Sequence, residues 1–271
     1  MQKINELQLA KELMKFPSIT PRDAGVMRFL EKKLKKIGFK TKILDFKEKN
    51  FQPVKNLYAR LGSKGRNFCF AGHLDVVPPG NIKDWTVNPF RPSIKKGHLI
   101  GRGANDMKGS VAAFVSAVSI FLNNNKSFNG SISLLITGDE EGDAVNGTKK
   151  VVDYLKKRNE KINFCLVGEP TNPNKLGEMI KIAGADELGN MVYGRDKMGL
   201  TFGASMGYGI LKNADDFGGD WGDDSDNSSG GGFDDDSDFG SDLVGLLWVA
   251  TGCRYLDFGF LGRGVGTGYF R

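Results

Sequence analysis

Runs of apolar residues at helical or strand spacing divide the first part of the chain into regular elements. Apolar positions recur at helical spacing over Ile4–Met14. Thr20, followed by Pro21 and Asp23, predicts the start of a second helix, because threonine suits the capping position, proline the first turn and an acid the positive end of a helix. This helix is expected to run to about Ile37, where a glycine follows.

Strands and helices then alternate as far as residue 167. Short apolar or alternating runs predict strands at about 40–46, 56–61, 67–71, 131–137 and 163–167, and helical patterns cover 110–122 and 148–157. Alternation of this kind is typical of an α/β fold, so we expect a mixed, mostly parallel sheet flanked by helices. In such sheets, ligands bind beyond the carboxyl ends of the strands.

The chain changes character near residue 182. Residues 1–182 contain 32 Lys and Arg against 17 Asp and Glu, whereas residues 183–271 contain 6 against 15. Residues 215–242 are mainly Gly, Asp and Ser, a composition that cannot form a packed core. We therefore predict a folded domain over 1–182 and a Gly- and Asp-rich segment over 183–271 that is partly disordered.

The basic charge of the first segment does not have the pattern of a nucleic-acid surface. Its lysines are spread over predicted helix faces without interleaved aromatic residues, as at Lys32, Lys33, Lys35 and Lys36. A basic surface also attracts small anions. We expect a small anionic substrate and no nucleic acid.

Signals for secretion or membrane insertion are weak in this sequence. The first six residues contain no apolar signal core, and the most apolar run, Leu243–Ala250, is shorter than the ~20 residues that span a bilayer. Cys69 and Cys165 lie in apolar strand-like runs, and Cys253 forms no CxxC pair with either. These features predict buried, reduced thiols in a cytoplasmic protein without membrane contact.

Candidate chemistry follows three of the predicted strands. His73 and Asp75 come at the end of one strand, Glu140 and Glu141 after the next strand of the apolar series, and Glu169 after the last. Because the carboxyl ends of parallel strands meet at one edge of a sheet, these side chains are expected to converge there. One imidazole and several carboxylates are the ligands that divalent metals use in hydrolases.

The spacing of His73 and Asp75 is typical of a metal-bound histidine with an orienting partner. Residues two apart in an extended segment face the same side, so Asp75 is placed to accept the second ring N–H of His73. The other histidine, His98, lies beside a basic pair and a glycine, where a surface turn is the expected role.

Two further acidic positions have both a structural and a catalytic interpretation. Asp106 lies between Gly103 and Gly109 just before a predicted helix, where a capping role is common, but a carboxylate can also bridge two metals about 3.5–4 Å apart. Glu140 and Glu141 are either solvated loop residues or a pair in which one binds metal and the other acts as general base.

These motifs together resemble those of the succinyl-diaminopimelate desuccinylases, which belong to the superfamily of di-zinc amidohydrolases and aminopeptidases. The resemblance covers residues 3–182. It is carried by the strings Gly72-His73-Leu74-Asp75-Val76-Val77-Pro78, Gly101-Arg102-Gly103-Ala104-Asn105-Asp106-Met107-Lys108-Gly109, Asp139-Glu140-Glu141-Gly142 and Gly168-Glu169-Pro170-Thr171.

The resemblance implies a zinc-peptidase-like catalytic domain with two divalent metals, zinc or cobalt. His73 and Glu169 would hold one metal, Glu141 would hold the other, and Asp106 would bridge them. Members of the family are homodimers, but the segment that forms their dimer is not recognisable here.

For the reaction, the resemblance implies that Glu140 is the general base and that Asp75 orients His73. The expected activity is hydrolysis of the amide bond of N-succinyl-LL-2,6-diaminopimelate to succinate and LL-2,6-diaminopimelate, on the route to diaminopimelate and lysine.

The chain departs from the family pattern after residue 182. The family supplies a second metal-binding histidine near its C-terminus, whereas this sequence has no histidine after His98. We therefore expect an incomplete catalytic sheet and a weak second metal site. The alternatives that stay open are a related deacylase of the acetylornithine deacetylase type and an inactive metal-binding or scaffold protein.

Overall fold

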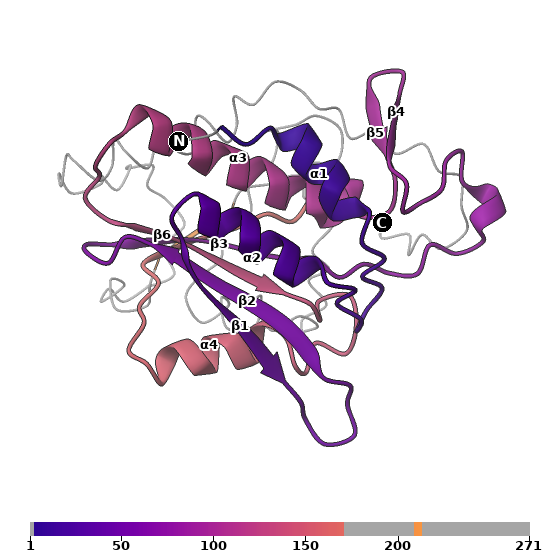
Figure 1. Ribbon diagram of the computed structural model, residues 1–271. Helices are drawn as coiled ribbons and strands as arrows, with labels where there is room; N and C mark the ends of the chain where they lie inside the picture. Colours follow the sequence, from indigo (N-terminus) through magenta and orange to yellow (C-terminus); the bar gives the residue numbers. More distant parts are fainter. Residues whose placement is uncertain (1–2, 171–208, 213–271) are drawn as a thin grey trace, which may run out of the picture.

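A six-stranded sheet runs through the middle of the structure (Figure 1). The computed structural model describes residues 3–170 and 209–212. In spatial order, the strands are β1 (Lys40–Phe46), β2 (Val54–Leu61), β6 (Ser131–Thr137), β3 (Asn67–His73), β7 (Phe164–Val167) and β8 (Gly209–Lys212). The sequence-based strands over residues 40–167 are thus confirmed, with shifts of one or two residues at their ends.

The sheet is mixed, as the sequence predicts. Strands β6, β3 and β7 are parallel to one another at its centre, whereas β2 and β8 are antiparallel to their neighbours. Because β1 is antiparallel to β2, it points the same way as the central strands. The carboxyl ends of β3, β6 and β7 therefore meet at one edge of the sheet.

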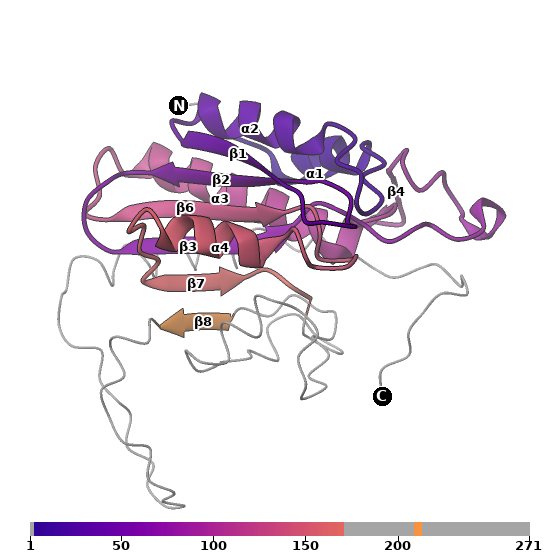
Figure 2. The same ribbon diagram turned by 90° about the horizontal axis from the view of Figure 1, so that it is seen from below.

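Helices cover both faces of this sheet. The helices α1 (Glu6–Met14), α2 (Val26–Lys36) and α3 (Gly109–Asn124) lie on one face, and α4 (Thr148–Lys156) lies on the other (Figures 1 and 2). The smaller elements are a hairpin of β4 (Ser93–Lys95) and β5 (His98–Ile100) and helical turns over Ile82–Asp84 (η1) and Ala104–Lys108 (η2). These pieces are too short to leave a periodic pattern in the sequence.

The core is built on the face that α3 covers. All seven residues of β6 are buried, and Phe70 of β3 stacks on Phe114 of α3 with ring centroids 4.5 Å apart. On the other face, Cys69 and Cys165 are register partners on β3 and β7, and both are buried free thiols. The prediction of buried, reduced cysteines is confirmed for these two, while Cys253 lies outside the described residues.

The predicted start of the second helix at Thr20 is wrong, because α2 begins at Val26. The backbone N–H of Thr20 donates to the carbonyl of Val76 at 3.1 Å, which holds this residue against the segment after β3. The Asp23 carboxylate accepts the N–H of Gly25 at 2.9 Å. Gly25 has a left-handed φ of 91°, which a right-handed α-helix cannot contain, so the helix can begin only after this residue. The tertiary pairing of Thr20 therefore moves the helix start to Val26, where the Asp23 carboxylate still caps the first turn by accepting the N–H of Met27 at 3.0 Å.

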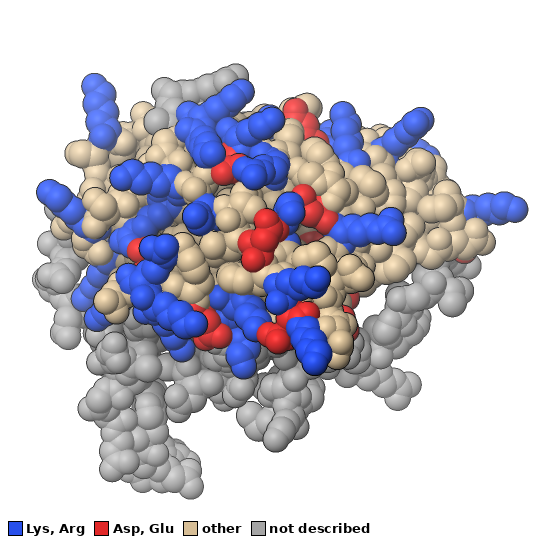
Figure 3. All heavy atoms as spheres, turned by 60° about the horizontal axis from the view of Figure 1, so that its bottom comes forward, with Lys and Arg blue, Asp and Glu red and all other residues tan. Residues whose placement is uncertain are grey.

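Lysine and arginine side chains are spread widely over the face shown in Figure 3, with acidic side chains among them. Some form surface ion pairs, such as Lys55 with Asp45 at 3.0 Å and Lys150 with Glu48 at 2.6 Å.

None of the helices in the described part of the chain combines the length and apolar character needed to span a bilayer. The Gly- and Asp-rich segment predicted beyond residue 182 lies outside the described residues, apart from β8.

Candidate metal centre

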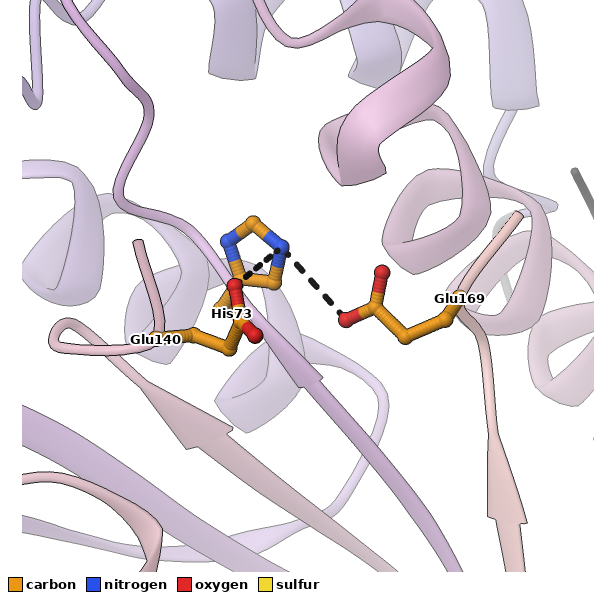
Figure 4. Close-up of side chains that lie close together, drawn as sticks. All are labelled: His73, Glu140 and Glu169. Carbon is orange, nitrogen blue, oxygen red and sulfur yellow. Dashed lines mark ion pairs between the residues drawn. The ribbon is translucent and has the colours of Figure 1, made fainter. Parts of the chain in front are cut away.

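The candidate site lies where the central strands end. His73 is the last residue of β3, Glu140 follows β6, and Glu169 follows β7. Figure 4 shows the His73 ring between the carboxylates of Glu140 and Glu169, as expected for side chains that leave parallel strands at one edge. Asp106 reaches the same ring from the turn before α3.

Three carboxylates surround one nitrogen of the His73 ring. Its Nε2 lies 2.9 Å from Oδ1 of Asp106, 3.5 Å from Oε1 of Glu169 and 3.6 Å from Oε2 of Glu140. The His73 side chain is completely buried, whereas the side chains of Asp106 and Glu140 are 43% and 46% exposed. The imidazole thus lies beneath the half-exposed carboxylates of Asp106 and Glu140, while the Glu169 side chain is only 19% exposed.

The other ring nitrogen of His73 is held by Asp75. Nδ1 lies 2.9 Å from the main-chain carbonyl oxygen of Asp75 and 3.5 Å from its carboxylate Oδ1. The carboxylate of Asp75 also accepts the backbone N–H groups of Glu140 at 3.1 Å and of Glu141 at 3.0 Å. The main-chain carbonyl of Asp75, rather than the carboxylate considered in the sequence analysis, is thus the nearer partner of the ring, and the carboxylate holds the loop that carries the two glutamates.

Two overlapping sets of three residues have the geometry of a metal site. One set is His73, Glu140 and Glu169, and the other is His73, Asp106 and Glu141; in each set, the candidate ligand atoms lie within 4.8 Å of one another. The sets contain all five metal-binding and base candidates of the sequence analysis, and His98 of β5 belongs to neither. An imidazole with several carboxylates suits zinc, cobalt and similar divalent ions.

The turn that presents Asp106 is anchored by a buried lysine that sequence reasoning did not single out. Lys108 is fully buried, and its Nζ donates to the carbonyl of Leu13 in the last turn of α1 at 3.2 Å and to that of Phe16, just after α1, at 2.8 Å. Burial lowers the pKa of Lys108 to about 7. Its place between Asp106 and Gly109 was the only signal in the sequence.

A second residue missed by sequence reasoning is Arg102. Its guanidinium carbon lies 5.1 Å from the centre of the Trp85 ring, and its Nη2 donates to the carbonyl of Pro78 at 3.3 Å. Burial lowers the pKa of Arg102, while the charges of Glu141 and Asp106 raise it. Arg102 is therefore a cation close to the acidic site.

Burial and mutual repulsion raise the pKa values of the glutamates in the cluster. Burial and the charge of Asp106 raise the pKa of Glu141 to about 7, and burial also raises the pKa of Glu140 and of Glu169. Burial alone would lower the pKa of His73, but the charge of Glu169 and the contact with Asp106 hold it well above its ordinary value. Divalent cations bound here would relieve this repulsion.

We expect Glu141→Gln to make the metal-free protein more stable than the unsubstituted protein at pH 8. At pH 5, this difference in the free energy of unfolding should be small. The pKa of Glu141 is about 7 in the folded chain, above its ordinary value of 4.5. A raised pKa means that the folded state favours the protonated form, so ionisation over this range destabilises the fold. Glutamine stays neutral and avoids this loss.

The measurement is the thermal midpoint of both proteins in chelator at pH 5 and pH 8, with an expected gain of a few degrees at the higher pH. Asp143→Asn, which removes an exposed acid from the same loop, serves as the control. An equal difference at both pH values would show that the environment of Glu141 does not raise its pKa.

Comparison with known protein families gives a match over residues 69–244 to the model of peptidase family M20/M25/M40. The chain is 74% identical over 182 residues to a succinyl-diaminopimelate desuccinylase from Pelagibacter ubique, covering 67% of this chain and 47% of the relative. It is 57% identical over 176 residues to the enzyme of that name from Rhodospirillum centenum, covering 65% and 46%. The chain thus spans about half the length of these curated relatives.

Two solved structures have a similar fold. Human carnosine dipeptidase 1 superposes with a TM-score of 0.54 at 27% identity, covering 61% of this chain and 40% of that one. An M20 family metallo-carboxypeptidase from Sulfolobus solfataricus has the same fold, with a TM-score of 0.54 at 24% identity over 64% of this chain and 39% of that one. On the strength of the family match and these relatives, the chain belongs to peptidase family M20/M25/M40.

Proposed function

We propose that this chain acts in the hydrolysis of the amide bond of N-succinyl-LL-2,6-diaminopimelate, which gives succinate and LL-2,6-diaminopimelate. The observation that carries the proposal is the convergence of His73 with the carboxylates of Asp106, Glu140 and Glu169. The specific substrate is suggested by the 74% identical relative, which is named a succinyl-diaminopimelate desuccinylase.

In this proposal, His73 and Glu169 hold one divalent metal, Glu141 holds a second, and Asp106 bridges them. Zinc and cobalt are the metals proposed. When bound, such metals lower the pKa of a water molecule and polarise the carbonyl of the amide. The donors present fit this role, because the candidate ligand atoms of one buried imidazole and of the carboxylates in each set lie within 4.8 Å of one another.

Glu140 is the proposed general base. Its carboxylate lies 3.6 Å from the His73 ring with nearly half of its side chain exposed, so a free oxygen can face an incoming water. Partial burial and the charges of Asp106 and Asp75 raise the pKa of Glu140, which makes its carboxylate a stronger base. Glu140 would take a proton from the attacking water and pass it to the nitrogen of the leaving amine.

We propose that the second metal binds more weakly than the first. The proposal assigns Asp106 and Glu141 to it from the described residues, and no further histidine follows His98 in the sequence. A lost partner around a metal typically reduces affinity tenfold or more.

The test of the proposed function is release of succinate from N-succinyl-LL-2,6-diaminopimelate by the full chain with added zinc or cobalt. The control substrate is an N-acetyl amino acid, whose acyl group lacks the terminal carboxylate of the succinyl group. Preferential succinate release supports the proposal, whereas a preference for the acetylated substrate would instead indicate a deacylase of the acetylornithine deacetylase type.

An inactive metal-binding protein is the second candidate, favoured by the absence of a histidine after His98. Native mass spectrometry separates the two possibilities, because it counts bound metals directly. If the chain binds two metals and releases succinate, the hypothesis of an inactive protein is excluded. If it binds no metal and releases no succinate, the hypothesis of an enzyme is excluded.

A further inference from the structure

The loop between β6 and α4, residues 138–147, carries both Glu140 and Glu141. Their backbone N–H groups donate to the carboxylate of Asp75, which fixes the loop on the side of the metal centre. The opposite side of the loop faces the interior, toward β2. What holds the loop there determines where the two glutamate side chains point.

Asn56 of β2 is the residue that holds this inner side. It is completely buried, and its Nδ2 donates to the carbonyl of Asn146 at 2.9 Å. Its Oδ1 accepts the hydroxyl of Thr137 at 2.8 Å, at the end of β6. Asn56 therefore joins the end of β6 to the last part of the loop through one amide group.

Thr137 and Asp139 extend this connection through the loop. The Oγ1 of Thr137 accepts the N–H of Asp139 at 3.1 Å, and the Asp139 carboxylate accepts the N–H of Asn146 at 2.9 Å. At Gly147, a Cβ atom would come within 2.7 Å of both the Asp139 carbonyl oxygen and the Thr137 hydroxyl, so the loop closes tightly on itself. Glu140 and Glu141 belong to the segment that is closed by the hydrogen bond between Asp139 and Asn146.

We infer that Asn56 is a positioning residue that holds residues 138–147 so that Glu140 and Glu141 face the metal centre. It touches neither glutamate and acts through Thr137 and Asn146. The inference rests on the proposed function for the roles of the two glutamates, but the hold on the loop is a property of the fold itself. Buried polar groups that lose a partner are strongly disfavoured, which makes this one loop arrangement the preferred one.

Two substitutions test this inference. Asn56→Leu removes both hydrogen bonds at nearly constant shape, and Thr137→Val removes one hydroxyl as a milder change if the first variant does not fold. In the metal-free full chain, we expect amide hydrogen exchange of residues 138–147 to become about tenfold faster or more in each variant. Exchange in α3 should stay the same.

The matched control is Asn67→Leu. Asn67 is 1% exposed, and its Nδ2 donates to the carbonyl of Lys161 at 2.9 Å, near the amino end of β3 and away from the metal centre. This variant should lose stability without faster exchange in residues 138–147. If Asn56→Leu and Thr137→Val lower the thermal midpoint but leave exchange of this loop unchanged, Asn56 is merely structural and the inference fails.

Metal binding and turnover give the functional readout. Displacement of Glu140 and Glu141 should lower kcat at least tenfold with little change in KM, and should weaken the second metal while the first stays bound. If the unsubstituted chain neither binds metal nor releases succinate, the proposed function fails, and the hydrogen-exchange comparison still decides the role of Asn56.

Discussion

Glu140→Gln is expected to reduce succinate release by about 10²- to 10⁴-fold while bound metal stays in place. Glutamine has the size of glutamate but cannot take a proton from the attacking water. In the structure, the nearest Glu140 oxygen lies 3.6 Å from Nε2 of His73. The measurements are succinate release and a metal count on the same preparation.

Metal loss in this variant would contradict the proposed assignment. Glu140 belongs to one of the two sets with metal-site geometry, together with His73 and Glu169. If Glu140→Gln released a metal, Glu140 would be a ligand, and Glu141 would become the candidate base. Glu48→Gln, at an acid on the surface after β1, should change neither quantity.

Asp106→Asn is expected to lower the affinity for both metals more than about 100-fold. This loss is larger than the loss caused by removing a residue that contacts a metal ligand but does not bind the metal itself. Asp106 is proposed to bridge the metals, and asparagine keeps its shape but removes the negative charge. The larger loss of affinity is expected for the metal that His73 is proposed to hold. Nε2 of His73 lies 2.9 Å from the Asp106 carboxylate.

Titration with cobalt, followed by its visible absorption, measures this effect without any need for turnover. Asp84→Asn makes the same chemical change at an exposed acid at the end of η1 and should leave both affinities unchanged. Loss of only one metal in Asp106→Asn would show that Asp106 is a ligand of that metal alone.

Some features of the fold were readable because the pattern was local and long. The seven buried residues of β6 and the spacing of α3 left clear signals, and both elements appear where the sequence places them. The start of α2 was not readable, because the pairing of Thr20 with Val76 depends on a contact between distant segments. The hairpin of β4 and β5 was missed because three residues are too few to show a period.

The site divides in the same way. The sequence alone determined the chemistry available, namely one histidine and the acids of four short motifs that mark peptidase family M20/M25/M40. Only the tertiary structure decided how these groups meet: parallel pairing of β3 with β6 and β7 brings His73, Glu140 and Glu169 to one edge. It also gave Asn56 its place behind the loop, because hydrogen bonds between residues distant in the chain exist only after the sheet has formed.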